Sequence, residues 1–227
     1  MTSQVSSKSL LIKVCGMRES ANIAAVADLE PDFLGFIFYP PSSRYAGATL
    51  RPELLRALPA SVRTIGVFVD EPIGRVLATL ASFGLDGAQL HGQETPAQCA
   101  QLRAAGYLVI KSFSVGKVLE LESLRPYEGS CDYFLFDTHG PARGGNGLTF
   151  DWELLRNYTL TTPYLLAGGL GPEHAVELTE LHLPGLVGVD LNSRFETAPG
   201  LKDPQRLRTA LARLRQGRSG RNSRQAV

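Results

Sequence analysis

The sequence predicts a single (β/α)8 barrel of the α/β class, and three features lead to that prediction. Short apolar runs alternate eight times with segments of helical period, and alternating βα units form parallel sheets. The loop after the first run, Cys15-Gly16-Met17-Arg18, lacks the G-x-G-x-x-G fingerprint of an open dinucleotide-binding sheet. Glycine clusters instead follow the sixth and seventh runs, at Gly144–Gly147 and Gly168–Gly171. Closed barrels of this class bind phosphate in the loops after strands seven and eight.

Eight segments are predicted to be strands because they are short and rich in apolar, β-branched or aromatic residues. Several are apolar at nearly every position, as strands buried on both faces must be. A sheet covered by helices follows from this pattern. The predicted strands are Leu10–Cys15, Phe33–Phe38, Thr64–Val69, Ala88–Leu90, Leu108–Ser112, Tyr133–Phe136, Tyr164–Ala167 and Leu186–Leu191.

The segments between and after these strands have helical period. Three of them begin with a proline, where the first helical turn tolerates a missing N–H: Pro96, Pro172 and Pro204. Ser20, Thr95 and Asp203 are expected to cap helix N-termini. The predicted helices are Ala21–Ala27, Arg51–Leu58, Ile73–Phe83, Pro96–Ala105, Val115–Leu124, Trp152–Asn157, Pro172–Leu181 and Pro204–Leu214.

One barrel domain is expected over residues 10–215, with a polar tail at each end. Residues 1–9 are Ser-rich without an apolar core, and they resemble neither a secretory signal nor an Arg-rich transit peptide. Residues 216–227 are basic and have little to bury, so we expect disorder in both tails. These features favour a cytoplasmic protein.

Composition excludes several classes of function. The 227 residues include 23 Lys and Arg against 22 Asp and Glu, and a net charge near zero gives no general attraction to nucleic acid or to a membrane surface. No apolar run approaches the roughly 20 residues that a membrane helix requires. The three cysteines form no CxxC pair and are expected to be reduced thiols. No His or Cys spacing is typical of a metal site, so we expect no metal.

Polar residues at the carboxyl ends of the predicted strands are the candidates for chemistry, because barrel enzymes place their active sites there. Each has a structural interpretation as well: a lone cysteine is usually a small core residue, and an aspartate after a strand often fixes a turn. Together the candidates indicate a phosphorylated small-molecule ligand that faces a thiol and a carboxylate. They are Cys15, Asp70, Gln89, His91, Lys111, Ser112, Asp137, Asp190, Asn192 and Ser193.

Segments along the whole barrel are similar, in the same order, to motifs of one family. They are Lys13–Met17, Leu34–Phe38 with Pro41–Tyr45, Gly66–Val69, Gln89–Gly92, Asp137 with the following Gly-rich loop and Phe150–Trp152, Leu166–Leu170 with Pro172 and Glu173, and Gly188–Glu196 with Pro199–Asp203. Each segment alone is weakly specific, whereas the ordered set from about residue 11 to 214 is very specific. The chain resembles the phosphoribosylanthranilate isomerase family.

The resemblance implies a barrel of the ribulose-phosphate-binding type that catalyses an Amadori rearrangement in tryptophan biosynthesis, without cofactor or metal. N-(5′-phosphoribosyl)anthranilate would become 1-(2-carboxyphenylamino)-1-deoxyribulose 5-phosphate. By family position, Asp137 is the acid that protonates the ribose ring oxygen, and Cys15 is the base that removes the C2′ proton. A free Asp has a pKa of about 3.9 and a free Cys of about 8.5. We therefore expect burial to raise the first, and a charge such as Lys13 to favour the Cys15 thiolate.

The resemblance also assigns substrate-binding positions. Arg44 matches the contact with the anthranilate carboxylate, and Gln89, His91 and Asp190 match further substrate contacts. The phosphate is expected on Gly168, Gly169, Asn192, Ser193 and Arg194. Many relatives have Ser-Ser-Gly where this chain has Asn192-Ser193-Arg194, and a Thr or Ser where it has Asn146, so the details of phosphate binding differ. Alternatively, the two glycines serve only a tight strand-to-helix turn.

The residues alone leave two alternative functions to consider. A barrel of the indoleglycerol-phosphate synthase or tryptophan synthase α type would need Lys or Glu catalysts at strand ends, and the pair Cys15 and Asp137 argues against it. A non-catalytic barrel that binds a phosphorylated ligand would be favoured by the loss of either residue, and both are present. The expected partner is the small-molecule substrate, and the protein is expected to be a monomer or a homodimer.

Overall fold

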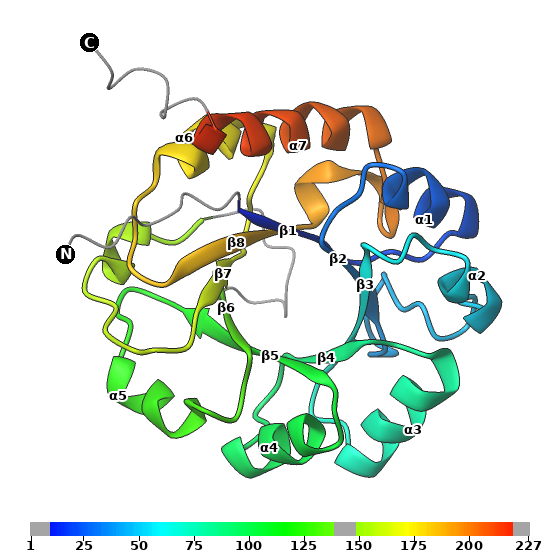
Figure 1. Cartoon of the computed structure of the whole chain (residues 1–227), viewed down its shortest axis with the longest axis horizontal. Coiled ribbons are helices and arrows are strands. Elements are labelled where there is room, and N and C mark those ends of the chain that lie inside the picture. The colour runs from blue at the N-terminus through cyan, green and yellow to red at the C-terminus, as the bar shows by residue number, and fades with distance from the viewer. Residues whose placement is uncertain (1–9, 139–148, 220–227) are drawn as a thin grey trace.

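Eight parallel strands close into a barrel in chain order, because β8 pairs with β1 just as β1 pairs with β2 (Figure 1). This computed structural model describes residues 10–138 and 149–219. The closure confirms the predicted (β/α)8 fold and rules out an open sheet. The strands are β1 (Leu11–Val14), β2 (Phe33–Ile37), β3 (Arg63–Phe68), β4 (Gly87–Leu90), β5 (Leu108–Val115), β6 (Tyr133–Thr138), β7 (Tyr164–Leu166) and β8 (Leu186–Leu191).

Helices surround the barrel and cover the outer face of its strands (Figure 1). The α-helices are α1 (Ser20–Ala27), α2 (Pro52–Arg56), α3 (Ile73–Phe83), α4 (Pro96–Ala104), α5 (Leu121–Leu124), α6 (Ala175–Glu180) and α7 (Pro204–Ser219). Short 3₁₀ helices are η1 (Arg125–Tyr127), η2 (Trp152–Leu155), η3 (Pro172–His174) and η4 (Ser193–Phe195). The predicted helix Val115–Leu124 is wrong in its first half, because β5 continues to Val115 and α5 begins only at Leu121.

Two of the three expected helix caps are present. The Thr95 hydroxyl accepts from the N–H of Gln98, whose side chain accepts in return from the N–H of Thr95. Asp203 accepts from the N–H groups of two residues at the start of α7, Gln205 and Arg206. Ser20, by contrast, is already helical: Glu19 is the N-cap of α1 and makes no side-chain cap bond. The prediction for Ser20 is therefore wrong.

Alternate residues of each strand point into the barrel and toward the helices. The floor of the barrel interior is apolar, with Phe33, Ile65, Ile110 and Leu135 in one cluster. A much larger apolar cluster lies between the strands and the helices. Nearer the carboxyl ends the inward positions become polar, as at Cys15, Gln89 and Asp190. Apolar packing thus stabilises the interior near the amino ends of the strands, and the polar side chains that could take part in a reaction lie near the carboxyl ends.

A hairpin follows β8 that the sequence did not indicate. Strands β9 (Glu196–Ala198) and β10 (Leu201–Lys202) pair antiparallel outside the barrel. Next, α7 ends at Ser219, beyond the predicted domain boundary at residue 215. The rest of the predicted tails, residues 1–9 and 220–227, lies outside the described residues.

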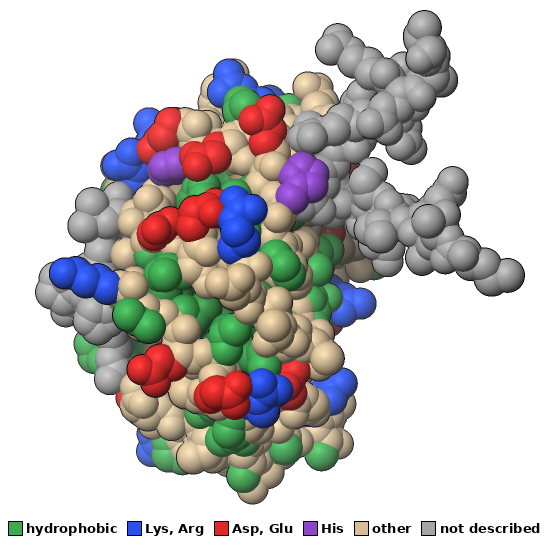
Figure 2. Space-filling model, turned by 90° about the vertical axis from the view of Figure 1, so that its left-hand side faces the viewer, with side chains coloured by type: hydrophobic (Ala, Val, Ile, Leu, Met, Phe, Trp, Pro, Cys, Tyr) green, Lys and Arg blue, Asp and Glu red, His purple; other side chains and the backbone are tan. Residues whose placement is uncertain are grey.

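The described surface is mixed in charge. On the face that Figure 2 shows, acidic and basic side chains are interspersed, and small hydrophobic patches are separated by polar surface. Ion pairs such as Arg125 with Glu122, at 2.8 Å, contribute to this pattern. Within the described residues, no helix is long and apolar enough to cross a membrane. All three cysteines are free and buried.

Candidate active site

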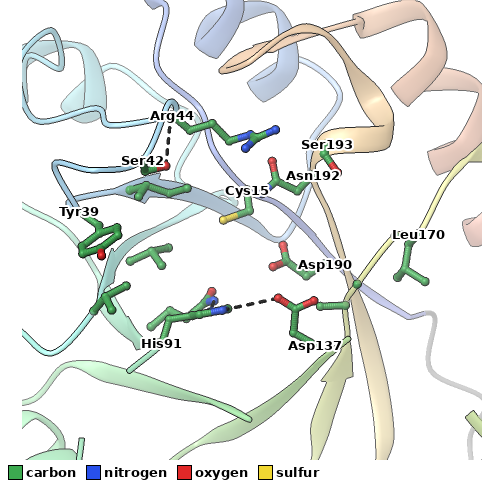
Figure 3. Close-up of a pocket in the computed structure, with 17 residues that line it drawn as sticks. Cys15, Tyr39, Ser42, Arg44, His91, Asp137, Leu170, Asp190, Asn192 and Ser193 are labelled. Atoms are coloured by element: carbon green, nitrogen blue, oxygen red, sulfur yellow. Dashed lines mark hydrogen bonds and ion pairs between the residues drawn. The ribbon is translucent and has the colours of Figure 1, made fainter. Parts of the chain in front are cut away.

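A pocket lies at the carboxyl ends of the barrel strands (Figure 3). All but one of the site residues that the family resemblance assigns line it. They are Cys15, Arg44, Gln89, His91, Asp137, Gly168, Gly169, Asp190, Asn192 and Ser193. Apolar side chains that the sequence did not single out, including Ile37, Val67 and Leu170, complete the walls. The exception, Arg194, lies outside this pocket, and its side chain forms an ion pair with Glu173 at 2.5 Å.

Strand β1 and the residue that directly follows it supply two of the central groups. Lys13 and Cys15 are two residues apart and point into the barrel, and Lys13 is paired in register with Asp190 of β8. The Lys13 Nζ atom lies 3.1 Å from both Asp190 carboxylate oxygens. A side chain at Gly35 would collide with this group, since its Cβ would lie 2.7 Å from Cys15 Sγ and 3.1 Å from Lys13 Nζ. The bare backbone of Gly35 makes room for the ammonium and the thiol side by side.

Burial dominates the protonation of Cys15. Burial raises the pKa of the thiol above its ordinary value, and the Lys13 ammonium opposes that shift only in part. For Lys13, burial acts to lower the pKa, but the neighbouring Asp190 carboxylate and Cys15 thiol more than compensate and raise it. The lysine does face the thiol as the sequence suggested. The net pKa shift of Cys15 is nevertheless upward, because desolvation is the larger effect.

Asp137 is the next-to-last residue of β6 and points toward the same space as Cys15 (Figure 3). Burial, together with the negative charge of Asp190, raises the pKa of Asp137 to about 6. Its Oδ1 atom accepts from the N–H of Thr138 at 2.8 Å, and its Oδ2 atom lies 3.5 Å from His91 Nε2. The carboxyl group is thereby held in place and keeps its proton to a higher pH than a free aspartate.

Gln89 and His91 lie two residues apart at the end of β4. The Gln89 amide nitrogen lies 3.0 Å from His91 Nδ1 and 3.1 Å from Ser112 Oγ. With Gln89 donating, His91 Nδ1 accepts, and the ring proton is on Nε2 toward Asp137. The Gln89 Oε1 atom is buried without a partner among the described residues. Gln89 therefore orients the imidazole.

Arg44 lies at one end of the pocket, in the loop after β2, and is held by a residue that the sequence did not single out. Its Nε donates to Glu196 Oε1 at 2.9 Å, and its Nη2 donates to Glu196 Oε2 at 2.7 Å. Burial acts to raise the pKa of Glu196, but Arg44 and Lys202 hold it below its ordinary value. Burial lowers the pKa of Lys202, which Glu196 opposes. Arg44 is thus fixed before any ligand arrives.

Glycines and loop residues form the other end of the pocket. Gly168 and Gly169 have φ angles of +82° and +64°, which glycine adopts readily. A Cβ at Gly168 would lie 2.5 Å from the backbone nitrogen of Thr138. Within the described residues, the N–H groups of Gly169 and Ser193 donate to no acceptor. N–H groups that have no acceptor among the described residues, in a loop of this kind, suit an anion. The cluster Gly144–Gly147 lies outside the described residues.

Two strand-end candidates lie away from the pocket. Asp70 accepts from the N–H of Gln93, and Lys111 points to the outer side of the barrel, where it pairs with Glu94 at 3.2 Å. Among the described residues, no group of three or more His, Cys, Asp or Glu side chains is placed to hold a metal ion. The pocket therefore combines a thiol, a carboxyl group of raised pKa and a receptor for an anion at each end.

Comparison with known proteins decides the family. The family model for N-(5′-phosphoribosyl)anthranilate (PRA) isomerase matches residues 12–213. The chain belongs to the N-(5′-phosphoribosyl)anthranilate isomerase family. A family member from Phocaeicola vulgatus is 48% identical over 207 residues, which cover 91% of this chain and 98% of the relative. One from Paracoccus denitrificans is 40% identical over 207 residues, covering 89% and 95%.

Solved structures of the phosphoribosylanthranilate isomerase family share the fold. The enzyme from Thermus thermophilus has a TM-score of 0.74 at 30% identity, covering 89% of this chain and 97% of that one. Another was solved in complex with reduced 1-(o-carboxyphenylamino)-1-deoxyribulose 5-phosphate; its TM-score is 0.71 at 27% identity, covering 90% and 98%. The family's barrel thus spans nearly all of this chain.

The residues that sequence reasoning missed come mainly from the β9–β10 hairpin. Glu196 and Lys202 are buried beside Arg44 and Asn192, but no strand-end rule points to a hairpin outside the barrel. Lys13 was detectable, because strand alternation places it on the same face as Cys15. The same alternation separates Ser112, which faces the pocket side, from Lys111, which does not.

Proposed function

We propose that the protein catalyses the Amadori rearrangement of N-(5′-phosphoribosyl)anthranilate to 1-(2-carboxyphenylamino)-1-deoxyribulose 5-phosphate, a step of tryptophan biosynthesis. The observation that carries this proposal is the placement of Cys15 and Asp137. A thiol that directly follows β1 and a carboxyl group from β6 face one pocket, between an arginine and a glycine loop that suit the two anionic groups of the substrate. Family membership supports the same reaction.

Asp137 is the general acid of this proposal. It donates its proton to the ribose ring oxygen, and the ring opens to a Schiff base. A carboxyl group with a pKa of about 6 retains a protonated fraction of about one tenth at pH 7, whereas an ordinary aspartate retains about a thousandth. The raised pKa therefore increases the population of the form that can act as an acid.

Cys15 is the general base. Its thiolate takes the C2′ proton of the Schiff base, and the resulting enolamine tautomerises to the ketone. The Lys13 ammonium beside the sulfur offsets part of the cost of the buried thiolate. Asp190, in turn, is the counterion that keeps Lys13 charged in the barrel interior. A thiolate of raised pKa is scarce but strongly basic, which suits the removal of a proton from carbon.

The two ends of the pocket bind the two anionic groups. The Arg44 guanidinium is planar and matches the anthranilate carboxylate. The phosphate lies against the N–H groups of Gly168, Gly169 and Ser193, with Asn192 as a further donor. His91 and Gln89, between the ends, hold the ribose hydroxyls and orient Asp137. The assignment needs no cofactor or metal, because the reaction consists of proton transfers and one ring opening that protonation of the ring oxygen drives.

The proposal extends to location and assembly. A protein with three free, buried cysteines suits the reducing cytoplasm, where its substrate would be made. We propose that it works as a monomer or a homodimer, without nucleic-acid or membrane partners. The Thermotoga maritima relative is described as dimeric, with monomers generated from it.

The deciding experiment follows the fluorescence of freshly prepared N-(5′-phosphoribosyl)anthranilate after addition of the purified protein and a metal chelator. We expect a rapid loss of fluorescence and a ketone product that is identified by carbon NMR. Asp137→Asn serves as the paired control, because it keeps the shape of the side chain and lacks the transferable proton. Unchanged fluorescence with folded wild-type protein would rule out the proposed reaction.

A further inference from the structure

A buried cluster of charged and polar side chains lies behind both anion-binding ends of the pocket. Its centre is Glu196, which accepts from Arg44 at 2.7 Å, from Lys202 Nζ at 2.6 Å and from the N–H of Gly200 at 3.1 Å. Lys202 Nζ also donates to Asn192 Oδ1 at 2.8 Å. One ammonium group therefore connects the residue that holds Arg44 with a residue at the phosphate end.

These groups converge over one backbone position. A Cβ at Gly16 would lie 2.7 Å from Asn192 Oδ1, 2.8 Å from Arg44 Cδ and 3.4 Å from Lys202 Nζ. Gly16 has a φ of +77° and directly follows Cys15. The loop after β2, the loop after β8 and the β9–β10 hairpin thus meet above the end of β1.

Lys202 itself is rigidly placed. Its side chain is fully buried. Its N–H donates to the Asn22 side chain at 2.8 Å, and its carbonyl accepts from the same amide at 2.8 Å. Asn22 belongs to α1, so a helix on the barrel holds the backbone of the hairpin. An ammonium that is anchored in this way has few alternative positions.

We propose that Lys202 is a positioning residue that sets the carboxylate end and the phosphate end of the pocket together. Toward the first end it acts through Glu196, which holds Arg44 by two nitrogens and leaves Nη1 for the ligand. Toward the second it holds Asn192 Oδ1, which leaves the Nδ2 donor for the phosphate. This inference rests on the proposed function and concerns how the substrate is held across its length.

The charges of the cluster support this role. Arg44 and Lys202 carry two positive charges against the single negative charge of Glu196. Without Lys202, Glu196 would neutralise Arg44, and the guanidinium would attract the substrate carboxylate less strongly. With Lys202, the cluster keeps one positive charge beside the pocket, although Lys202 does not line the pocket itself.

The test compares three ligands by titration calorimetry on wild type and on Lys202→Met, which keeps the length of the stem. The parent ligand is reduced 1-(2-carboxyphenylamino)-1-deoxyribulose 5-phosphate; the second lacks the carboxylate, and the third lacks the phosphate. We expect the parent to bind about 10- to 100-fold more weakly to the variant, the range for lost hydrogen bonds to charged groups. Each truncated ligand should lose several-fold less than the parent, because each lacks one of the two contacts.

A merely structural role gives another pattern. If Lys202 only supported the hairpin, all three ligands would weaken by the same factor, and that result overturns the proposal. If only one truncated ligand loses less affinity than the parent, that result also overturns the proposal, because Lys202 then acts on only one end of the pocket. Steady-state kinetics provide a second measure: we expect KM to rise by more than kcat falls.

Glu196→Gln keeps the proposal testable if Lys202→Met does not fold. This variant keeps the side-chain shape and removes the charge that holds Arg44. We expect the affinity of both ligands that carry the carboxylate to change, because Arg44 loses its positioning contact and gains net charge, and the ligand without the carboxylate to bind as before; an equal change for all three overturns the proposal. Failure of wild type to bind the parent ligand or to rearrange the substrate would refute the proposed function instead.

Discussion

Two buried lysines in this barrel form similar ion pairs in different surroundings. Lys13 pairs with Asp190 at 3.1 Å, and Lys111 pairs with Glu94 at 3.2 Å. Both ammonium groups are almost fully buried. The first pair lies inside the barrel beside the Cys15 thiol, whereas the second lies on the outer side of β5, next to the loop that leads into α4.

The remaining contacts of the two lysines distinguish their roles. Lys111 also donates to the carbonyls of Leu90, Gly92 and Ser112, at 3.2, 2.9 and 3.0 Å. Its acceptors are all fixed backbone or carboxylate groups, as in a structural ion pair. Lys13 shares its ammonium between Asp190 and Cys15, and the thiol lines the pocket. Burial and ion pairing alone therefore do not identify a functional lysine. What distinguishes Lys13 is its further contact with Cys15, a side chain that lines the pocket.

The largest expected effect is on the thiol beside Lys13. Cys15→Ser should lower kcat by about 10²- to 10⁴-fold, the range for a general acid–base group. A serine hydroxyl is far less acidic than a thiol, so the anion that takes the proton is almost never formed. The matched control is Cys99→Ser, a buried cysteine outside the pocket. It should keep its turnover while it loses stability. A Cys15→Ser variant with near-wild-type turnover would show that another residue is the base.

Breaking the two ion pairs tests the comparison directly. Lys13→Met and Lys111→Met should each lower the free energy of unfolding by about 3–5 kcal/mol, because each leaves a buried carboxylate unpaired. Denaturant titration measures this loss. Under conditions where both variants are folded, only Lys13→Met should also lower kcat. Equal activity losses in the two variants would contradict the functional distinction between the pairs.

Asp137 should limit stability as well as support catalysis. Its pKa is raised from 3.8 to about 6 by burial, so its stabilising contribution is fully present below pH 4 and is lost as pH rises through 6. A shift of about two units corresponds to about 3 kcal/mol. Asp137→Asn should therefore be more stable than wild type at pH 8, by up to about 3 kcal/mol. The advantage should vanish near pH 4 in parallel thermal melts; an advantage independent of pH would contradict this cause.

The smallest effect concerns the glycine loop. Gly169 and Gly84 have φ angles of +64° and +66°, so an alanine at either position should cost a similar 1–2 kcal/mol, roughly the cost of the left-handed conformation. A Cβ at Gly84, far from the pocket, would meet no neighbouring atom within 4 Å. Only Gly169→Ala should weaken the binding of product and inorganic phosphate, by about 10-fold. Unchanged affinity would leave the turn as the only role of Gly169.

Periodic segments allowed most of the fold to be predicted from the sequence. The predicted bounds of α3, Ile73–Phe83, and of β8, Leu186–Leu191, agree with the structure, because both have strong, uninterrupted apolar patterns. The segment Val115–Leu124 was misjudged because its first residues are compatible with either state, and pairing with β6 extends β5 to Val115. Tertiary pairing thus decided where local preference was weak.

The candidate site was predictable to the extent that it follows strand ends. Cys15, Asp137 and Asp190 occupy inward positions that alternation identifies. Glu196 and Lys202 were not predictable in this way, because they reach the pocket through a hairpin whose position depends on Asn22 of α1. The side chain of Arg194 was also not predictable: its orientation toward Glu173 depends on contacts between two separate loops.

The pairing of Lys13 with Asp190 joins positions 177 residues apart in the chain, across the seam where β1 meets β8 (Figure 1). At a synthesis rate of about 5–20 residues per second, Lys13 precedes its counterion by roughly 10–35 s. Until β8 is made, the growing chain has an open β1 edge and an unbalanced charge on its inner face. The return of activity on refolding should therefore follow the docking of β8 against β1, the strand pairing with the longest sequence separation in the barrel, so that activity reports that the last strand has docked.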